Sequence, residues 1–234
     1  MAVAWGLFVF PIFWHESSIE RTANQIIAGD LFKGSLLAGL FPIIVSIESS
    51  TYCRPSAVRS AAIIELRMAE GTAPANNLKH VDGRLRSLNQ TIRSSLSCSP
   101  SDPFLWLVLY WSEGTQDGFR SEDLKYLRMS YLLGPNEGWI ALKRNGITFA
   151  VSEKLPVDLA EYAIIEFVGL IEMGFYEQAA EIFTGPAWRV REQLLPRLEN
   201  IEERHRQAFA DILYTKGYDI VVPGIKRRGS RPWP

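Results

Sequence analysis

Residues 101–216 constrain the fold more than any other part of the chain, because they form a series of short amphipathic patterns with a helical period. The same short motif interrupts this series twice. A Gly-Pro pair occurs at Gly134-Pro135 and again at Gly185-Pro186, and each pair is followed within a few residues by a tryptophan, Trp139 or Trp188. Glycine favours the end of a helix, whereas proline cannot continue a helix but readily starts one. The pattern therefore predicts an all-α fold, built as an array of antiparallel helical hairpins.

A long helix is predicted before this stretch. Five apolar residues in the segment 78–92 are spaced by three and four positions, which places them on one helix face. This seam is too short for a free-standing coiled coil, so we expect a long helix packed on its neighbours. The five residues are Leu78, Val81, Leu85, Leu88 and Ile92.

Composition and turn signals divide the chain into four segments. Residues 1–14 are a hydrophobic N-terminal segment, 15–100 a helical region, 101–217 the helical hairpins and 218–234 an extended basic tail. An Asp-Pro pair at 102–103 marks the second boundary, since aspartate suits the N-cap of a helix and proline its first position.

Several helix ends can be predicted from single residues. Ser121 and Asp158 are placed to cap helices, and Gly174 is placed to end one. Pro196 falls inside a helical pattern, which it should kink or split. The apolar run 36–47 also holds a proline, and it predicts either a core strand or a kinked core helix.

Residues 1–14 carry no charged side chain and are too apolar for a solvent-exposed segment. They are shorter than the ~20 residues that span a bilayer, and they lack the basic start and cleavage pattern of a signal peptide. Three interpretations stay open: a membrane anchor whose first residues are missing from this start, an interfacial or re-entrant segment, and a helix buried in a soluble core. Trp5 and Trp14 flank the run as an interfacial aromatic belt would, which favours the membrane.

The two cysteines, Cys53 and Cys98, each lie at the edge of a predicted helix, two residues before a proline. Antiparallel helices between them would bring these edges together, and an even number of cysteines tends to pair in an oxidising compartment. The alternatives are a disulfide and two buried reduced thiols, and the compartment decides between them.

Residues 160–186, AEYAIIEFVGLIEMGFYEQAAEIFTGP, resemble a tetratricopeptide-type (TPR-type) helical hairpin. The small Ala179-Ala180 pair lies where two helices must approach each other, and Gly-Phe-Tyr marks the turn before it. The stretches 102–106 and 126–135 resemble this pattern in the spacing of their aromatic, glycine and proline residues. The chain also resembles membrane-associated TPR-like proteins of the bacterial cell envelope, although no strict period of about 34 residues holds and the array is degenerate. The resemblance implies a TPR-like α-solenoid that mediates protein–protein interactions.

No catalytic, cofactor-binding or metal-binding signature is recognisable in the sequence. The three histidines, His15, His80 and His205, stand in no metal-ligand spacing, and the motifs of phosphate cradles and of the hydrolase nucleophile elbow are lacking. We therefore predict no catalytic residue, no cofactor and no metal.

Tryptophans are the candidate partner-binding residues, because a Trp ring offers a large apolar face and one hydrogen-bond donor. Packing in a helical core is the more ordinary role for tryptophans in such an array. The four candidates are Trp106, Trp111, Trp139 and Trp188.

The charge distribution excludes a nucleic-acid surface on the folded body, since the net charge of the whole chain is −1 and the positive charge gathers at the C-terminus. A short basic end of this kind contacts phosphate or an acidic partner, or is a solvated, frayed terminus. The basic residues concerned are Lys226, Arg227, Arg228 and Arg231.

Together these features predict a non-catalytic helical adaptor or scaffold that mediates protein–protein interactions in a bacterial envelope assembly, such as a polysaccharide-export system. Residues 1–14 would associate with the inner membrane, with the body on the periplasmic side; the alternative location is cytoplasmic. Two other functions stay open: a small-molecule-binding helical protein or enzyme with a pocket lined by Trp and Tyr, and a soluble structural subunit of a larger complex.

Overall fold

The computed structural model describes residues 17–50, 52–70 and 78–226. Every regular element in these residues is a helix, and no strand occurs among them. The fold is therefore all-α, which confirms the predicted class. The hydrophobic segment 1–14 and the end of the basic tail, 227–234, lie outside the described residues.

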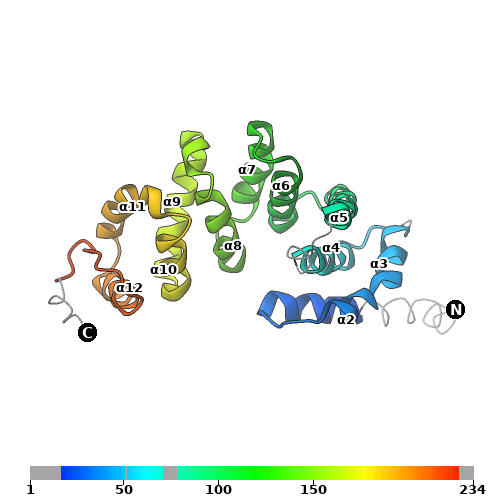
Figure 1. Ribbon diagram of the computed structural model, residues 1–234, viewed down its shortest axis with the longest axis horizontal. Coiled ribbons are helices and arrows are strands. Elements are labelled where there is room, and N and C mark those ends of the chain that lie inside the picture. Colours follow the sequence, from blue (N-terminus) through cyan, green and yellow to red (C-terminus); the bar gives the residue numbers. More distant parts are fainter. Residues whose placement is uncertain (1–16, 51, 71–77, 227–234) are drawn as a thin grey trace, which may run out of the picture. The chain divides into compact units, whose positions relative to one another are not determined.

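The chain forms two compact units, which we call unit 1 (through Leu133) and unit 2 (from Gly134). Figure 1 labels the helices of both. In unit 1, residues 17–28 are helical, and the long helices pack successively, α4 on α5, α5 on α6 and α6 on α7. The bounds are α2 Gly34–Ala38, α3 Phe41–Glu48, α4 Pro55–Glu70, α5 Leu78–Cys98, α6 Pro103–Asp117, a 3-10 turn Ser121–Asp123 and α7 Leu124–Leu133.

Unit 2 is built in the same way, with α8 on α9, α9 on α10 and α10 on α12. Its bounds are α8 Gly138–Phe149, α9 Val157–Glu172, α10 Tyr176–Thr184, α11 Arg191–Arg197 and α12 Glu203–Thr215, with 3-10 turns at Ser152–Lys154, Trp188–Val190 and Leu198–Asn200. Pro196 splits the predicted helix as expected, since α11 ends one residue later and a 3-10 turn follows. Residues 218–226 contain neither helix nor strand.

The predicted long helix is present as α5, which runs without a break from Leu78 to Cys98. Of its apolar seam, Leu85, Leu88 and Ile92 are buried. The side chains of Leu78 and Val81 lie outside the described part of the chain. The helix thus buries its apolar seam between α4 and α6.

The apolar run 36–47 forms two short helices, α2 and α3, which excludes the core strand considered above. Pro42 lies in the first turn of α3, where its missing N–H costs no helical hydrogen bond. The proline therefore lies at the start of a helix and does not kink one. Inward residues of both helices pack on α4; the buried members of this cluster are Ile19, Leu37, Ile44, Ile47, Ala57, Val58, Ala61 and Ile64.

The predicted ends at Asp102 and Gly174 are confirmed. The Asp102 carboxylate accepts hydrogen bonds from the N–H groups of Phe104 and Leu105 at 2.9 and 3.3 Å, at the start of α6. After α9, Gly174 has φ +87°, a conformation that favours glycine. The N–H of Phe175 then bonds to the carbonyl of Leu170 at 2.9 Å, which closes the helix with a Schellman motif.

The two other predicted caps are wrong. Ser121 lies inside the 3-10 turn that precedes α7, and the N-cap residue is Arg120, which makes no side-chain cap hydrogen bond. Asp158 is the second residue of α9, and the N-cap is Pro156. Proline presets its own backbone for the entry to a helix, so α9 starts earlier than the capping rule placed it. The Asp158 carboxylate still lies in the first turn, where the helix dipole favours negative charge.

Four phenylalanines form the centre of unit 2, one each from α8, α9, α10 and α12. The ring of Phe167 lies 6.2 Å from that of Phe149, and 6.0 Å from those of Phe183 and Phe209. All four side chains are buried. Edge-to-face and stacked aromatic contacts at these distances add to the burial energy, so this cluster joins the four helices.

Among the described residues, no helix combines the length and the apolar character needed to cross a bilayer.

Candidate functional site

The four candidate tryptophans divide evenly between the two units. Trp106 and Trp111 lie on α6 in unit 1, whereas Trp139 is on α8 and Trp188 in a 3-10 turn of unit 2. All four are partly exposed. Each of them is therefore accessible to solvent on part of its surface, and their role in partner binding stays a prediction.

In unit 1, Trp106 belongs to an aromatic and cationic group, the Trp106 surface: Trp106, Tyr126, Arg93 and Lys125. The indole stacks on the Tyr126 ring with centroids 5.9 Å apart, and its Nε1 donates to the carbonyl of Pro100 at 2.8 Å. The Arg93 guanidinium and the Lys125 ammonium lie 5.8 and 4.9 Å from the centre of the Tyr126 ring. These are cation–π distances, so the positive charges are held beside the aromatic pair.

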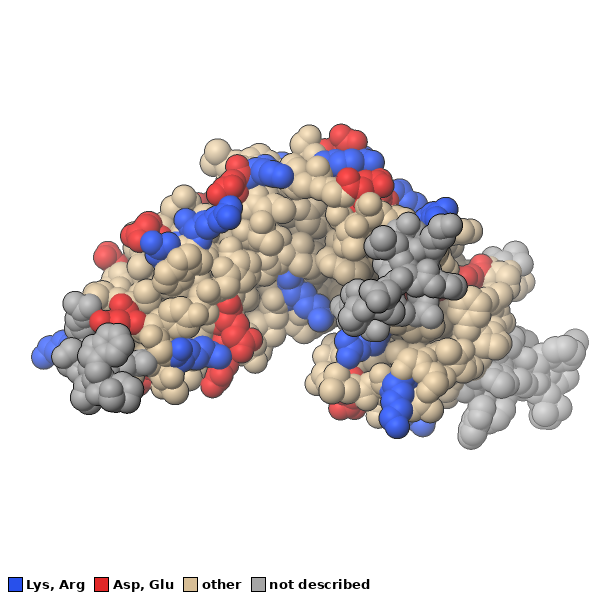
Figure 2. Space-filling view, in the orientation of Figure 1, with Lys and Arg blue, Asp and Glu red and all other residues tan. Residues whose placement is uncertain are grey.

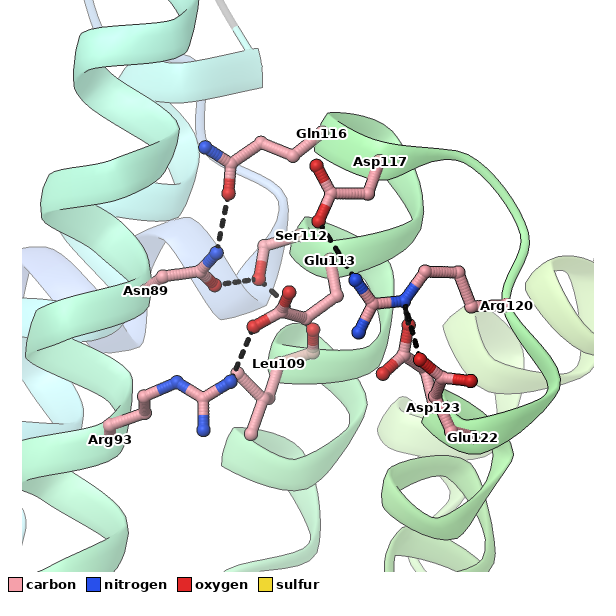
Figure 3. Close-up of polar contacts among 10 residues, drawn as sticks. All are labelled: Asn89, Arg93, Leu109, Ser112, Glu113, Gln116, Asp117, Arg120, Glu122 and Asp123. Atoms are coloured by element: carbon pink, nitrogen blue, oxygen red, sulfur yellow. Dashed lines mark hydrogen bonds and ion pairs between the residues drawn. The ribbon is translucent and has the colours of Figure 1, made fainter.

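A polar network that includes Arg93 of this surface joins α5 to α6 (Figure 3). Arg93 of α5 pairs with Glu113 of α6. The buried Ser112 hydroxyl donates to Asn89 Oδ1, and Asn89 Nδ2 donates to Gln116 Oε1 at 2.7 Å. These side chains thus supply one another's hydrogen-bond partners across the helix pair, as is typical of a structural contact between helices.

Arg120 forms a second cluster in Figure 3, between α6 and α7. Its guanidinium lies 3.1 Å from Asp117 and 3.2 Å from each of Glu122 and Asp123. Asp123 is almost fully buried. Burial of Tyr110, together with the negative charge of Asp123, raises the pKa of the Tyr110 hydroxyl. One cation among three carboxylates holds the loop that links the two helices.

Trp139 and Trp111 each lie beside a local hydrogen bond. Trp139 is the second residue of α8, and its Nε1 donates to Glu137 Oε2 at 3.2 Å. Trp111 lies in the middle of α6, where its backbone carbonyl accepts a hydrogen bond from Thr115 Oγ1 at 2.8 Å.

In unit 2, Trp188 belongs to a second group, the Trp188 surface: Trp188, Arg191 and Tyr218, with Val221, which lines one pocket with Tyr218. The indole contacts Tyr218 at 5.9 Å between centroids and stands edge-on to buried Phe183 at 6.4 Å. The Arg191 guanidinium lies 4.4 Å from the centre of the indole ring, and its Nη1 donates to the Trp188 carbonyl at 2.8 Å. Trp188, Tyr218 and Val221 are 36%, 37% and 54% exposed.

A shallow pocket adjoins this surface, between α12 and the segment that follows it. Its volume is about 30 Å³, which is room for about one water molecule. Its walls include Tyr214, Tyr218, Val221 and the charged Asp219 and Lys226. A site of this size cannot enclose a metabolite, because ligand pockets measure ~300–1,000 Å³.

Cys53 and Cys98 are joined by a disulfide in unit 1, with their Cα atoms 5.6 Å apart. This separation lies within the range that a disulfide requires. The residues lie just before α4 and at the end of α5, and these helices pack on each other. The compartment that would maintain the bond in the cell stays a prediction.

The sequence analysis missed a buried ion pair between α8 and α9. Arg144 is fully buried, its Nε donates to Glu166 Oε1 at 3.0 Å, and its Nη2 donates to the carbonyl of Gly134 at 2.9 Å. Asn145 Nδ2 adds a bond to the carbonyl of Ala163 at 2.8 Å. Both charged residues fall in ordinary amphipathic helices, so no local signal distinguishes them from solvated residues.

A second missed feature is the buried carboxyl of Glu65 on α4. Burial, together with the negative charge of Glu48, raises the pKa of Glu65 to about 7. Hydrogen bonds from Thr91 and Ser87 act in the opposite direction but are outweighed. Thr91 of α5 also donates to Glu48 Oε1. A cluster of two carboxyls is typical of acid–base sites, but Glu65 is enclosed by helices and offers no access to a substrate-sized molecule.

Among the described residues, no group of His, Cys, Asp and Glu could hold a metal ion. His205 Nδ1 lies 2.8 Å from the Tyr176 hydroxyl, a pair between α10 and α12. His15 and the side chain of His80 are outside the described part of the chain. Comparisons with family models, curated proteins and solved structures found no match for this chain.

Proposed function

We propose that this protein is a non-catalytic, TPR-like helical adaptor that binds a protein partner in a bacterial envelope assembly. The observation that carries the proposal is the Trp188 surface, where an aromatic pair and an arginine stand partly exposed beside a buried phenylalanine core. Tryptophan, tyrosine and arginine are the residues that most often dominate binding energy at protein interfaces.

The Trp188 surface is preorganised, which supports binding to a protein. The indole is held by ring contacts with Phe183 and Tyr218 and by the guanidinium of Arg191. A side chain already held in place loses little conformational entropy when a partner covers it. The adjoining pocket of about 30 Å³ could admit one small apolar group from a partner, but not a free metabolite.

The hairpin of α9 and α10 supports the TPR-like part of the proposal. Gly174 closes α9, Phe175 follows, and α10 starts at Tyr176, which is the turn that the resemblance implied. Ala179 and Ala180 are fully buried on α10. Small residues at this position allow α10 to lie close to the helices on which it packs.

The proposed location is the periplasmic face of the inner membrane, with residues 1–14 as the membrane contact. The disulfide between Cys53 and Cys98 supports an oxidising compartment, because such bonds are rare in the reducing cytosol. A polysaccharide-export system is the example we propose for the assembly.

Site-specific photocrosslinking in cells tests the adaptor function. A photoreactive phenylalanine analogue at position 188 should yield one discrete protein adduct. The matched control is the same analogue at Tyr162 of α9, which is 36% exposed, as Trp188 is. The double substitution Trp188→Ala and Tyr218→Ala should abolish co-purification of the adduct partner, whereas Tyr162→Ala should preserve it. Identical adduct patterns at both positions, or recovery of a small molecule bound to the purified protein, would refute the proposal.

A further inference from the structure

The chain that follows α12 turns back over this helix. The helix ends in a Schellman motif, in which Gly217 has φ +99° and the N–H of Tyr218 bonds to the carbonyl of Leu213 at 2.9 Å. The residues that follow, 219–226, contain neither helix nor strand, and we call them the strap. Val222 in the middle of the strap is buried, and it lines the shallow pocket together with residues of α12. The strap therefore covers one side of α12.

Arg206 of α12 holds the second half of the strap. Its Nη1 donates a hydrogen bond to the carbonyl of Pro223 at 2.9 Å. The next residue, Gly224, has φ +74°, and a Cβ atom there would lie 2.3 Å from the same Nη1. Position 224 thus requires glycine for two reasons, its left-handed backbone and the close approach of the guanidinium. We call this the Arg206 contact, and it keeps the strap against the helix.

The strap is held incompletely in this position. Arg206 Nε is buried and has no hydrogen-bond acceptor among the described residues. A buried donor without an acceptor costs free energy, which is regained when the group reaches water. The strap also leaves the pocket of about 30 Å³ between itself and α12. Segments without regular hydrogen bonding open more readily than the helices beside them, so the strap is poised to open.

Opening the strap would widen this pocket into a groove along α12. The helix contributes residues to the pocket that share one face by their spacing, namely Gln207, Ala210, Asp211 and Tyr214. The strap and Tyr218 supply the rest of the lining, so departure of the strap uncovers that face. Tyr218 also contacts the ring of Trp188. The groove would therefore continue the Trp188 surface.

The chemistry of this groove suits a segment of another protein. The strap lines the pocket with Ile220, Val222 and Ile225, which are buried or half-buried. Charged groups of both signs, such as Asp211 and Lys226, complete the lining, and Figure 2 shows acidic and basic side chains at the α12 end of unit 2. An apolar centre with a polar rim is typical of protein interfaces. The occupant that fits is a polypeptide segment with apolar side chains, as the strap itself is.

We propose that the strap is a displaceable lid on this face of α12, and that the partner of the Trp188 surface inserts an apolar segment of its own in place of the strap. This inference rests on the partner binding proposed above. A closed lid lowers the apparent affinity in proportion to the fraction of molecules that are open. Tyr218 stays in place in both states, because the Schellman motif fixes it to α12.

Hydrogen exchange on the full chain tests whether the Arg206 contact holds the strap. Arg206→Met removes the hydrogen bond to Pro223 and keeps most of the bulk of the side chain. The Ile225 amide, which donates to the Val222 carbonyl at 3.1 Å, should then exchange about tenfold faster. The matched control is Arg204→Met on the same helix, where the side chain is 73% exposed, and it should leave this rate unchanged. Equal rates in the two variants would overturn the lid.

Gly224→Ala opens the strap by a different route, because the added Cβ atom meets Arg206. Gly118→Ala is its control. Gly118 has φ +76° with nothing within 4 Å of its Cβ position, so this change brings the same backbone strain without a collision. Exchange at Ile225 should accelerate in Gly224→Ala and not in Gly118→Ala, and the same response in both would count against the Arg206 contact. Circular dichroism checks that both variants keep their helices.

Photocrosslinking in cells then tests the lid as a control on partner binding. With the photoreactive analogue at position 188, Arg206→Met should raise the yield of the partner adduct severalfold, because more molecules are open. Arg204→Met should leave the yield as it is. An unchanged or lower yield in Arg206→Met would overturn the lid, although the Trp188 surface would stand. If no adduct forms at position 188 in any variant, the proposed partner binding and the lid both fall.

Discussion

Arg144 and Glu166 form an ion pair inside unit 2, with Nε 3.0 Å from Oε1 and with side chains 0% and 5% exposed. The pair links α8 to α9, and the same guanidinium reaches back to the carbonyl of Gly134. It therefore connects the start of unit 2 to its central helices. A buried charge is tolerated only while its partner is present, so this pair offers a clear test of the packing.

Removing one member of the pair should destabilise the protein strongly. Arg144→Met leaves the Glu166 carboxylate buried without its counter-charge, at a cost of about 3–5 kcal/mol in the free energy of unfolding. Replacing both, Arg144→Met with Glu166→Leu, should recover much of this loss, because no charge then remains in the core. Urea unfolding of the three proteins measures the difference.

The exposed pair of Arg197 and Glu161 is the control for this series, since it also joins α9 to a neighbouring helix. Its side chains are 47% and 41% exposed. Arg197→Met should therefore change the free energy of unfolding by no more than ~1 kcal/mol. Equal effects at Arg144 and Arg197 would contradict the buried arrangement.

The close packing around Ala180 leads to a second prediction about stability. The residue is fully buried on α10, which packs on α8, α9 and α12. Ala180→Leu should overpack this contact and reduce the free energy of unfolding by about 1–3 kcal/mol. Gln178→Leu introduces the same side chain on the exposed side of the same helix and should have little effect. Thermal melts of both variants give the comparison; coincident curves would place Ala180 in solvent.

The disulfide between Cys53 and Cys98 should contribute about 3–4 kcal/mol, because it closes a loop of 45 positions in the unfolded chain. Native protein denatured without reductant should not react with a thiol reagent, whereas reduced protein should react at both cysteines. The variant Cys53→Ser with Cys98→Ser should match the stability of the reduced protein. Reaction of both thiols in unreduced protein isolated from cells would remove the argument for an oxidising compartment.

The raised pKa of Glu65 predicts how the free energy of unfolding depends on pH. Its pKa is raised to about 7 by burial in the folded state, from the ordinary value of 4.5 that applies when the chain unfolds. Between these values the folded chain binds a proton that the unfolded chain does not, so the free energy of unfolding falls as pH rises. The loss amounts to roughly 3 kcal/mol from pH 4.5 to pH 7, with little further change above.

Urea unfolding across this pH range measures the dependence. Glu65→Gln cannot ionise, so it should flatten the curve and stabilise the protein relative to the unaltered chain above pH 7. Glu199→Gln, at an exposed site on the 3-10 turn after α11, controls for the loss of one negative charge. A curve that keeps its slope in Glu65→Gln would show that another group is responsible.

The sequence by itself determined the features that depend on neighbours along the chain. Helical periodicity and end signals are local, so they predicted the all-α class, the buried positions Leu85, Leu88 and Ile92, the cap at Asp102 and the helix end at Gly174. The misplaced caps at Ser121 and Asp158 show the limit of such signals, because residues next to them also set where a helix starts.

Tertiary structure alone decided the features that depend on which helices meet. Arg144 and Glu166 are 22 positions apart, and Glu65 meets Thr91 from another helix. Whether a charged side chain is enclosed or solvated follows from the packing of several helices, and periodicity within one helix contains no information about it. The same reason applies to Phe41 and Val45 of α3, since the apolar run predicted a core element and the packing of its helices leaves these two side chains partly exposed.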